Sequence, residues 1–65
     1  MPITKGQLVT YVVRSQTIQA MVRTVHRDGD SVTVEARHVL KNGTPHGAYL
    51  GFLYRMAVAD VCPCT

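Results

Sequence analysis

The sequence predicts an all-β fold: one small five-stranded barrel, made of a strongly bent antiparallel sheet with a long central hairpin. Short apolar runs alternate with clusters of turn residues along the chain, and no run has the period of an amphipathic helix. An Asp-Gly pair lies between two of these runs. Sixty-five residues are enough for one domain, so we expect a single domain over 1–65, with 62–65 as a C-terminal tail.

The central hairpin is expected over 17–40, with its turn at Asp28 and Gly29. Asp-Gly in this setting is typical of a two-residue type I′ turn, in which both central residues have positive φ. Such a turn places Val25 opposite Val32, but beyond this pair the apolar residues of the two strands no longer face one another. One extra residue near 23–24 restores the match, and this β-bulge would bend the hairpin, whereas the alternative is a flat hairpin. The bulge predicts three further facing pairs: Val22–Val34, Ala20–Ala36 and Ile18–His38.

Two strands show residues alternating between faces, the pattern of a β-strand. In the strand over 31–40, one face is expected to hold Val32, Val34, Ala36 and Leu40, and the other Thr33, Glu35, Arg37 and Val39. In the strand over 7–14, one face holds Val9, Tyr11 and Val13, and the other Leu8, Thr10 and Val12. Both faces of this first strand are largely apolar, so we expect both to be covered.

The remaining segments are bounded by turn residues. Residues 14–16 are expected to form a short exposed loop, and 41–47, which contain Asn-Gly, Pro and Gly, a longer one. The dense apolar run over 48–59 is compatible with a helix or a strand. A strand over 48–56 is favoured, because Gly51 inside it is typical of a bend or a close backbone approach. Residues 57–61 either form a turn plus a final strand or continue this strand.

Composition favours self-association over an isolated chain. Hydrophobic residues make up 46% of the sequence and charged residues 17%, an apolar surplus for so small a core. We therefore expect a homo-oligomer, a dimer or higher. The net charge of +3 contains no run of like charge, so an anionic partner is permitted but not required. The N-terminus lacks the apolar segment of a signal peptide, and no apolar run is long enough for a membrane span. We therefore expect a cytoplasmic protein with no membrane partner.

The order of the apolar residues and turns resembles the small SH3-like barrels. The residues that carry the resemblance are Gly6, Val9, Tyr11, Ala20, Val22, Val25, the Asp28-Gly29 pair, Val32, Val34, Asp60 and Val61. The group includes Tudor-like and KOW-like modules and the type II dihydrofolate reductases, whose Val-Gln-Ile-Tyr signature this chain lacks. The resemblance implies a barrel fold, with an aromatic cage for methylated cations or a basic nucleic-acid edge as possible uses. Fold alone does not assign function.

No catalytic, metal or cofactor motif stands out in the sequence. Cys62-Pro63-Cys64 could hold a soft metal, but two incidental thiols are the favoured interpretation. His38 is expected at an inward position, where a hydrogen-bonded core or interface role is favoured over catalysis. Glu35 is expected to pair with neighbouring arginines on the outer face, a weak interaction when exposed.

The favoured function is a non-enzymatic, homo-oligomeric binding module for a protein or small-molecule ligand. The alternatives are a nucleic-acid-binding barrel with a basic surface and an enzyme whose site forms between subunits. We predict no catalytic residue, no metal site and no cofactor. The candidate ligand or nucleic-acid contacts are Arg14, Arg23, Arg27, Arg37, Lys41, His46 and Tyr49.

Overall fold

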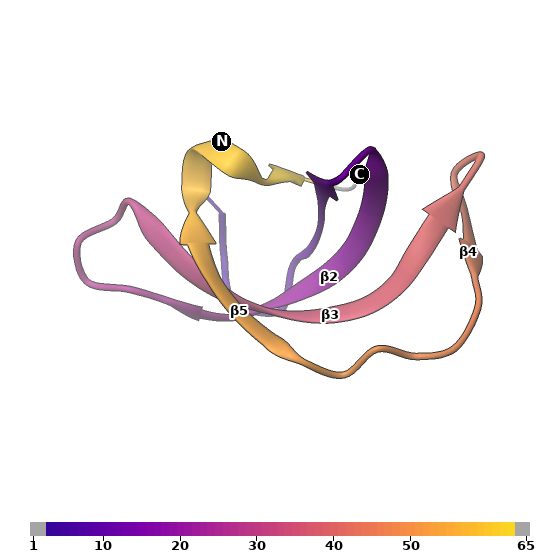
Figure 1. The fold of residues 1–65 in the computed structure, drawn as a ribbon. Helices are drawn as coiled ribbons and strands as arrows, with labels where there is room; N and C mark the ends of the chain where they lie inside the picture. The colour runs from indigo at the N-terminus through magenta and orange to yellow at the C-terminus, as the bar shows by residue number, and fades with distance from the viewer. Residues whose placement is uncertain (1–2, 64–65) are drawn as a thin grey trace.

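The computed structural model describes residues 3–63 and contains a single antiparallel sheet (Figure 1). Its strands pair in the order β4-β3-β2-β1-β6. β4 pairs with the C-terminal end of β3, and β5 pairs with the N-terminal half of β3 on the same edge. The elements in chain order are β1 (Leu8–Val13), β2 (Gln16–Val25), β3 (Ser31–Lys41), β4 (Thr44–His46), β5 (Leu53–Ala57), a 3₁₀ helix (Val58–Asp60) and β6 (Cys62–Pro63). The predicted all-β class and long central hairpin are confirmed.

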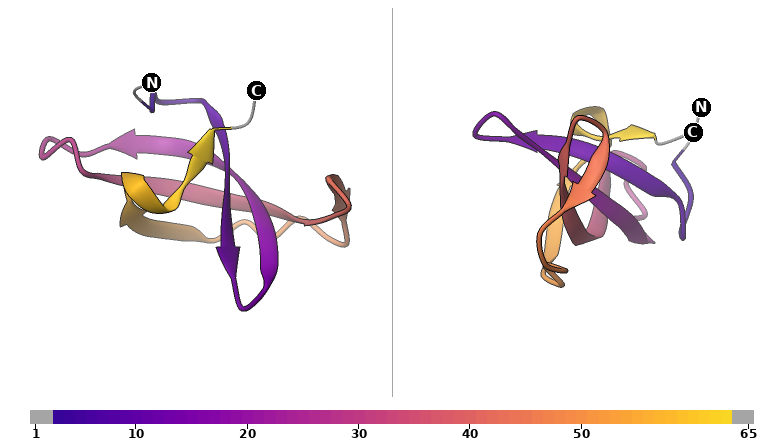
Figure 2. Two further views of the ribbon diagram at one scale, coloured as in Figure 1. Left: turned by 90° about the horizontal axis from the view of Figure 1, so that it is seen from above. Right: turned by 90° about the vertical axis from the view of Figure 1, so that its right-hand side faces the viewer.

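The sheet curls into a half-barrel around its own inner face. Figure 1 shows β2 and β3 bowed beneath β1, the 3₁₀ helix and β6, and Figure 2 shows β1 running across the direction of β3. Four valines on this inner face are almost fully buried, Val9, Val22, Val32 and Val34. Burial of apolar side chains from β1, β2 and β3 on one face is the main stabilising contribution that this arrangement supplies.

The predicted bulge in β2 is present, but β3 has a second irregularity that the pattern did not indicate. The register is Val25–Val32 and Val22–Val34, and Arg23 has no partner in β3. Ala20 faces Ala36 as predicted, but the register then shifts by one because Arg37 has no partner in β2. The expected Ile18–His38 pair is therefore wrong.

This second shift exchanges the faces of the residues that follow it. Ile18 lies opposite Val39, and His38 lies opposite Gln19. Val39 packs against the core, contrary to its expected outward position, and Leu40 is displaced from the inner face. A shift of one residue has this effect because side chains alternate between the two faces of a strand.

The β2–β3 turn is not the predicted type I′ turn. Gly29 has a φ of 74°, but Asp28 is not among the described residues with positive φ. The N–H of Gly29 donates to the carbonyl of His26 at 3.1 Å, and the Asp28 carboxylate accepts from the N–H groups of Asp30 and Ser31. The side chain of Asp28 thus closes a longer loop in the manner of an Asx-turn.

Tight two-residue turns with positive φ at both positions occur elsewhere. They are Arg14–Ser15, with φ of 48° and 68°, and Asn42–Gly43, with 54° and 79°. The second turn makes the expected loop over 41–47 wrong, because Thr44–His46 return along β3 as β4. Positive φ at both positions matches the twist of the flanking strands.

The apolar run over 48–56 is only partly a strand. β5 begins at Leu53, and the preceding residues follow the β3 bulge in an irregular path. There the N–H of Leu50 donates to the Arg37 carbonyl at 2.7 Å, and Gly51 donates to Ala36 at 2.8 Å. After β5 comes the 3₁₀ helix, and the final strand, β6, lies at Cys62–Pro63 rather than within the predicted 57–61. Cys62 and Pro63, which were expected in a tail, pair with β1.

The helical content of residues 3–63 is the three-residue 3₁₀ helix. None of the helices in this range is long and apolar enough to cross a membrane.

Candidate functional site

An apolar pocket of about 300 Å³ opens on the inner face of the half-barrel. We call it the aromatic pocket. The residues that line it are Tyr11, Val13, Gln16, Ile18, Val39, Leu50, Phe52 and Tyr54. It is at the lower limit of the size of typical small-ligand sites, which are concave, mostly apolar and supplied with a few polar groups.

The floor of the aromatic pocket is a cross-strand row. Tyr11 on β1 lies opposite Ile18 on β2, which lies opposite Val39 on β3. All three side chains point to the inner face, since directly paired residues in an antiparallel sheet share a face. Val13 and Gln16 form the next facing pair along β1 and β2 that lines the pocket, beside the Arg14–Ser15 turn.

The rings of the pocket contact one another in two geometries. Tyr11 and Tyr54 are stacked, with centroids 6.1 Å apart and planes 11° from parallel. Phe52 meets Tyr54 edge-on, at 6.1 Å and 71°. Both arrangements are favoured by aromatic quadrupoles. Tyr11 is 3% exposed, whereas Phe52 and Tyr54 are each nearly half exposed, so the second pair offers ring surface to a ligand.

The aromatic pocket is electrically neutral. Of the described residues that line it, none carries a charge, and those with polar side-chain groups are Gln16, Tyr11 and Tyr54. Burial, and then the neighbouring Tyr54, raises the pKa of Tyr11 above its ordinary value of 10.0, so this phenol is protonated at neutral pH.

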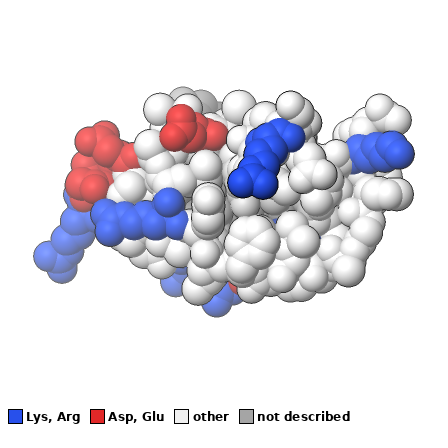
Figure 3. Space-filling view, in the orientation of Figure 1, with Lys and Arg blue, Asp and Glu red and all other residues white. Residues whose placement is uncertain are grey.

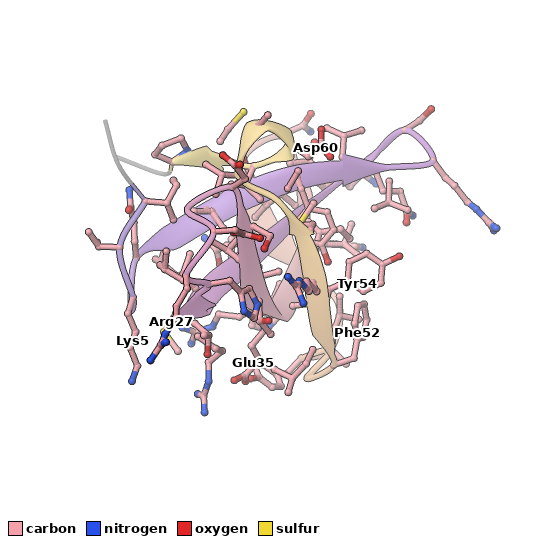
Figure 4. The ribbon with its side chains drawn as sticks, turned by 90° about the vertical axis from the view of Figure 1, so that its left-hand side faces the viewer. Lys5, Arg27, Glu35, Phe52, Tyr54 and Asp60 are labelled. Atoms are coloured by element: carbon pink, nitrogen blue, oxygen red, sulfur yellow. The ribbon has the colours of Figure 1, made fainter. Side chains whose placement is uncertain are left out.

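The exposed rings point away from the charged side chains that Figure 4 labels. Figure 4 shows Phe52 and Tyr54 projecting together, away from Lys5, Arg27, Glu35 and Asp60. These rings lie on the side that faces the viewer in Figure 3. One basic side chain stands near the upper centre of that side, a broad uncharged area lies below it, and the other charged side chains lie nearer the edges.

The basic candidates from the sequence lie at separate places. Arg14 is exposed in the β1–β2 turn, Lys41 is exposed beside the Asn42–Gly43 turn, and Arg27 is exposed in the β2–β3 loop. Arg23 pairs with Glu35 at 3.1 Å, as predicted for the outer face, and Arg37 occupies the bulge of β3. None of these five residues lines the aromatic pocket.

The two remaining candidates also lie outside the aromatic pocket. His46 is on β4 opposite Val39, and Tyr49 meets His38 edge-on with ring centroids 5.8 Å apart. None of the eight residues that line the aromatic pocket was among the candidates from the sequence. The expected outward position of Val39 hid its place in the pocket wall.

A second groove lies on the outer face. Its lining residues are Lys5, Gly6, Met21, Val22, Arg23, Thr24, Thr33 and Leu53, and we call it the outer groove. Lys5 is held here because the N–H of Gly6 donates to the Val22 carbonyl at 2.8 Å. The outer groove therefore combines two cations with two threonine hydroxyls.

Across residues 3–63, no three His, Cys, Asp or Glu side chains come close enough together to hold a metal ion. Cys62 is exposed on β6, and Cys64 lies outside the described residues, so the Cys-Pro-Cys motif cannot be assessed as a pair. His26 is engaged with Thr33, its Nε2 lying 2.8 Å from the hydroxyl oxygen.

The described residues thus form a neutral aromatic pocket and a separate groove whose lining includes Lys5 and Arg23. Comparison of the chain with protein-family models, with curated proteins and with solved structures finds no match to any of the three.

Proposed function

We propose that the protein is a non-enzymatic binding module that uses the aromatic pocket to hold an uncharged, apolar group of its ligand. The observation that carries the proposal is the half-exposed pair of rings, Phe52 and Tyr54, over a floor of buried apolar residues. Rings held by packing lose little conformational entropy on binding, and they offer a large apolar area. The half-barrel is also compatible with the resemblance to small barrels that act as interaction modules.

The test is a titration of ¹⁵N-labelled protein with small apolar probes, followed by amide chemical shifts. We expect shifts to concentrate at residues 11–18, 39 and 50–54. Tyr54→Ala should weaken binding, whereas Leu53→Ala should not, because Leu53 is 63% exposed and lines the outer groove. Shifts spread over the molecule, or equal effects of the two variants, would contradict the proposal.

We further propose that the module acts as a homo-oligomer. β1 buries Val9 and Tyr11 on its inner face, but its outer face carries Leu8 and Val12, which are 38% and 69% exposed. Burying such residues against a second copy would remove apolar surface from water, which is favourable by about 25 cal/mol per Å². The small size of the core in a chain of 65 residues supports the same proposal.

A second candidate function, nucleic-acid binding, is supported by the outer groove. Lys5 and Arg23 could contact phosphates, and Thr24 and Thr33 add hydroxyl groups. Such binding would be electrostatic and weakly sequence-specific, and its affinity would fall steeply with salt. Absence of binding to single- and double-stranded oligonucleotides at low salt would remove this candidate. Salt-insensitive, sequence-selective binding would contradict this form of it.

A further inference from the structure

We infer that the aromatic pocket selects a neutral aromatic side chain, an indole or a phenol, presented by a segment of a partner protein. The inference rests on the proposed function and deepens it, because it names the group that the pocket holds. Four properties of the pocket carry it: the angle between its exposed rings, its volume, its lack of charge and its one side-chain amide.

The angle between Phe52 and Tyr54 favours a ring over an aliphatic group. The two planes are 71° apart, so a ligand ring that stacks on one of them meets the other edge-on. Both contacts are preferred aromatic geometries, worth about 0.5–1.5 kcal/mol beyond burial alone. An aliphatic side chain of equal size would gain only the burial.

The volume and the Tyr11–Tyr54 contact define where this ring lies. Tyr11 and Tyr54 already stack at 6.1 Å, a separation that leaves no room for another ring between them. The ligand must therefore lie against Tyr54 and Phe52 over the aliphatic floor. A space of about 300 Å³ suits one large side chain rather than an extended ligand.

The charge distribution favours a neutral ligand over a cationic one. All four acidic residues of the chain are described, and none of them lines the aromatic pocket. Asp28 and Asp30 lie in the β2–β3 loop, Glu35 pairs with Arg23, and Asp60 lies on the 3₁₀ helix. A bound cation would have no carboxylate partner there, and the charged residue next to Val13 along the chain is Arg14.

Gln16 distinguishes an indole or phenol from a plain hydrocarbon ring. Gln16 lines the pocket, and its side-chain amide offers both a hydrogen-bond acceptor and donors. An indole N–H or a phenol O–H can donate to the amide oxygen while the ring remains against Phe52 and Tyr54.

We favour a protein partner over a nucleobase because the two basic side chains that share a groove lie elsewhere. A nucleotide brings a phosphate with its ring, and the groove that combines two cations is the outer groove, with Lys5 and Arg23. The walls of the aromatic pocket, as far as the structure describes them, hold no lysine or arginine.

The experiment compares matched probes by amide chemical shifts of the ¹⁵N-labelled wild-type protein. The probes are N-acetyl-tryptophanamide, N-acetyl-tyrosinamide, N-acetyl-leucinamide and uridine monophosphate. We expect the two aromatic amides to bind roughly 2- to 12-fold more tightly than the leucine amide, the fold-change that corresponds to the aromatic contribution above. Gln16→Ala should weaken the binding of the tryptophan and tyrosine amides and leave the binding of the leucine amide unchanged.

The outcomes separate this inference from the function on which it rests. Equal affinity for all three amides at the pocket would overturn the aromatic preference while leaving the binding module intact. Binding of none of the probes would overturn both. Tighter binding of uridine monophosphate than of the aromatic amides would overturn the inference in favour of nucleic acid. Since the comparison among probes is made on the wild-type protein, it does not depend on whether a variant folds.

Discussion

At the scale of single residues, Asp28 shows how one side chain can organise a loop. Its carboxylate accepts hydrogen bonds from the N–H of Asp30 at 2.9 Å and of Ser31 at 3.1 Å, and from the Ser31 hydroxyl. The guanidinium of Arg55, on β5, lies 3.7 Å away. These donors, with the Asp30 N–H first, hold the pKa of the Asp28 carboxyl below its ordinary value of 3.8.

This pKa leads to a prediction about acid. The unfolded chain binds the proton of this carboxyl more readily than the folded protein, so the stabilisation that Asp28 contributes is present above about pH 4 and is lost as pH falls below it. At pH 7 we expect the stability order wild type, Asp28→Asn, Asp28→Ala, because Asn keeps an oxygen for the two N–H groups but loses the charge. Denaturant unfolding at several pH values checks it. A gap between wild type and Asn that does not narrow in acid would contradict it.

The second residue-scale prediction concerns the glycines of two turns. Gly29 has a φ of 74° and Gly43 a φ of 79°, and a Cβ at either position would meet no atom within 4 Å. The cost of a side chain therefore comes from the left-handed backbone alone, which a β-branched residue adopts poorly. Gly29→Val and Gly43→Val should each destabilise by about 1–3 kcal/mol.

A loop over 41–47 would have allowed Gly43→Val to relax at a lower cost, but the observed two-residue turn does not. Denaturant melts of both variants at one fixed protein concentration measure the costs, since the stability of an oligomer depends on concentration. A neutral Gly43→Val variant would show that the Asn42–Gly43 turn is not formed.

The third residue-scale prediction concerns alkaline pH. Because burial raises the pKa of Tyr11 above 10.0, the unfolded chain loses this proton first. The folded state is therefore destabilised as pH rises above 10, whereas below 10 its stability is unaffected by this group. We expect Tyr11→Phe to lose less stability than wild type between pH 9 and 11, measured by thermal melts. An equal loss would show that the Tyr11 phenol is solvated.

At the scale of elements, the two irregularities of the β2–β3 ladder decide which residues reach the core. The bulge at Arg23 restores Val22 to the inner face opposite Val34. The shift at Arg37 then brings Val39 inward, beside Ile18 and Tyr11. Bulges bend the strand that contains them and increase its twist, so the same features also curl the sheet.

This register predicts the opposite of what uninterrupted alternation along β3 would give, in which Leu40 would face inward and Val39 outward. Val39 packs against the core, so Val39→Ala should cost about 1 kcal/mol, in line with the loss of partly buried methyl groups. Leu40→Ala removes more atoms but should cost less, because Leu40 lies on the outer face beside Pro45. The free energy of unfolding of each variant checks the order. A larger cost for Leu40→Ala would place the register shift elsewhere.

At the scale of the whole molecule, the half-barrel leaves two surfaces uncovered. Leu50, Phe52 and Tyr54 are exposed at the aromatic pocket, and Leu8, Val12 and Leu53 are exposed elsewhere on the molecule. Apolar patches of this kind mark interaction sites on small proteins. We assign the first to a partner protein and the outer face of β1 to a second copy of the chain.

This assignment predicts a dimer that one charge can dissociate. Sedimentation at micromolar concentration should give at least twice the 7.2 kDa mass of the chain. Val12→Lys should shift the mass towards a monomer, because it places a charge in the proposed interface. The matched control is Thr24→Lys, on an exposed position of β2, which should leave the mass unchanged. A monomeric wild-type protein would rule out self-association.

The sequence by itself determined the all-β class, the central hairpin, the bulge at Arg23 and the buried face of Val32 and Val34. These features depend on local chemistry, namely period-two alternation and the facing of apolar residues across one hairpin. The location of the tight turns was harder to predict from the sequence. Asp28-Gly29 and Arg14-Ser15 can both adopt the backbone of a two-residue turn, and contacts with neighbouring residues decide which of them does.

Only the tertiary structure decided the second shift of β3 and, with it, the aromatic pocket. The shift is accompanied by hydrogen bonds from Leu50 and Gly51 to Arg37 and Ala36, residues more than ten positions earlier in the chain. A pattern read along one strand carries no information about a partner that arrives from a distant segment. The pocket likewise joins β1, β2, β3 and the segment that leads into β5, so its shape exists only after the sheet has curled.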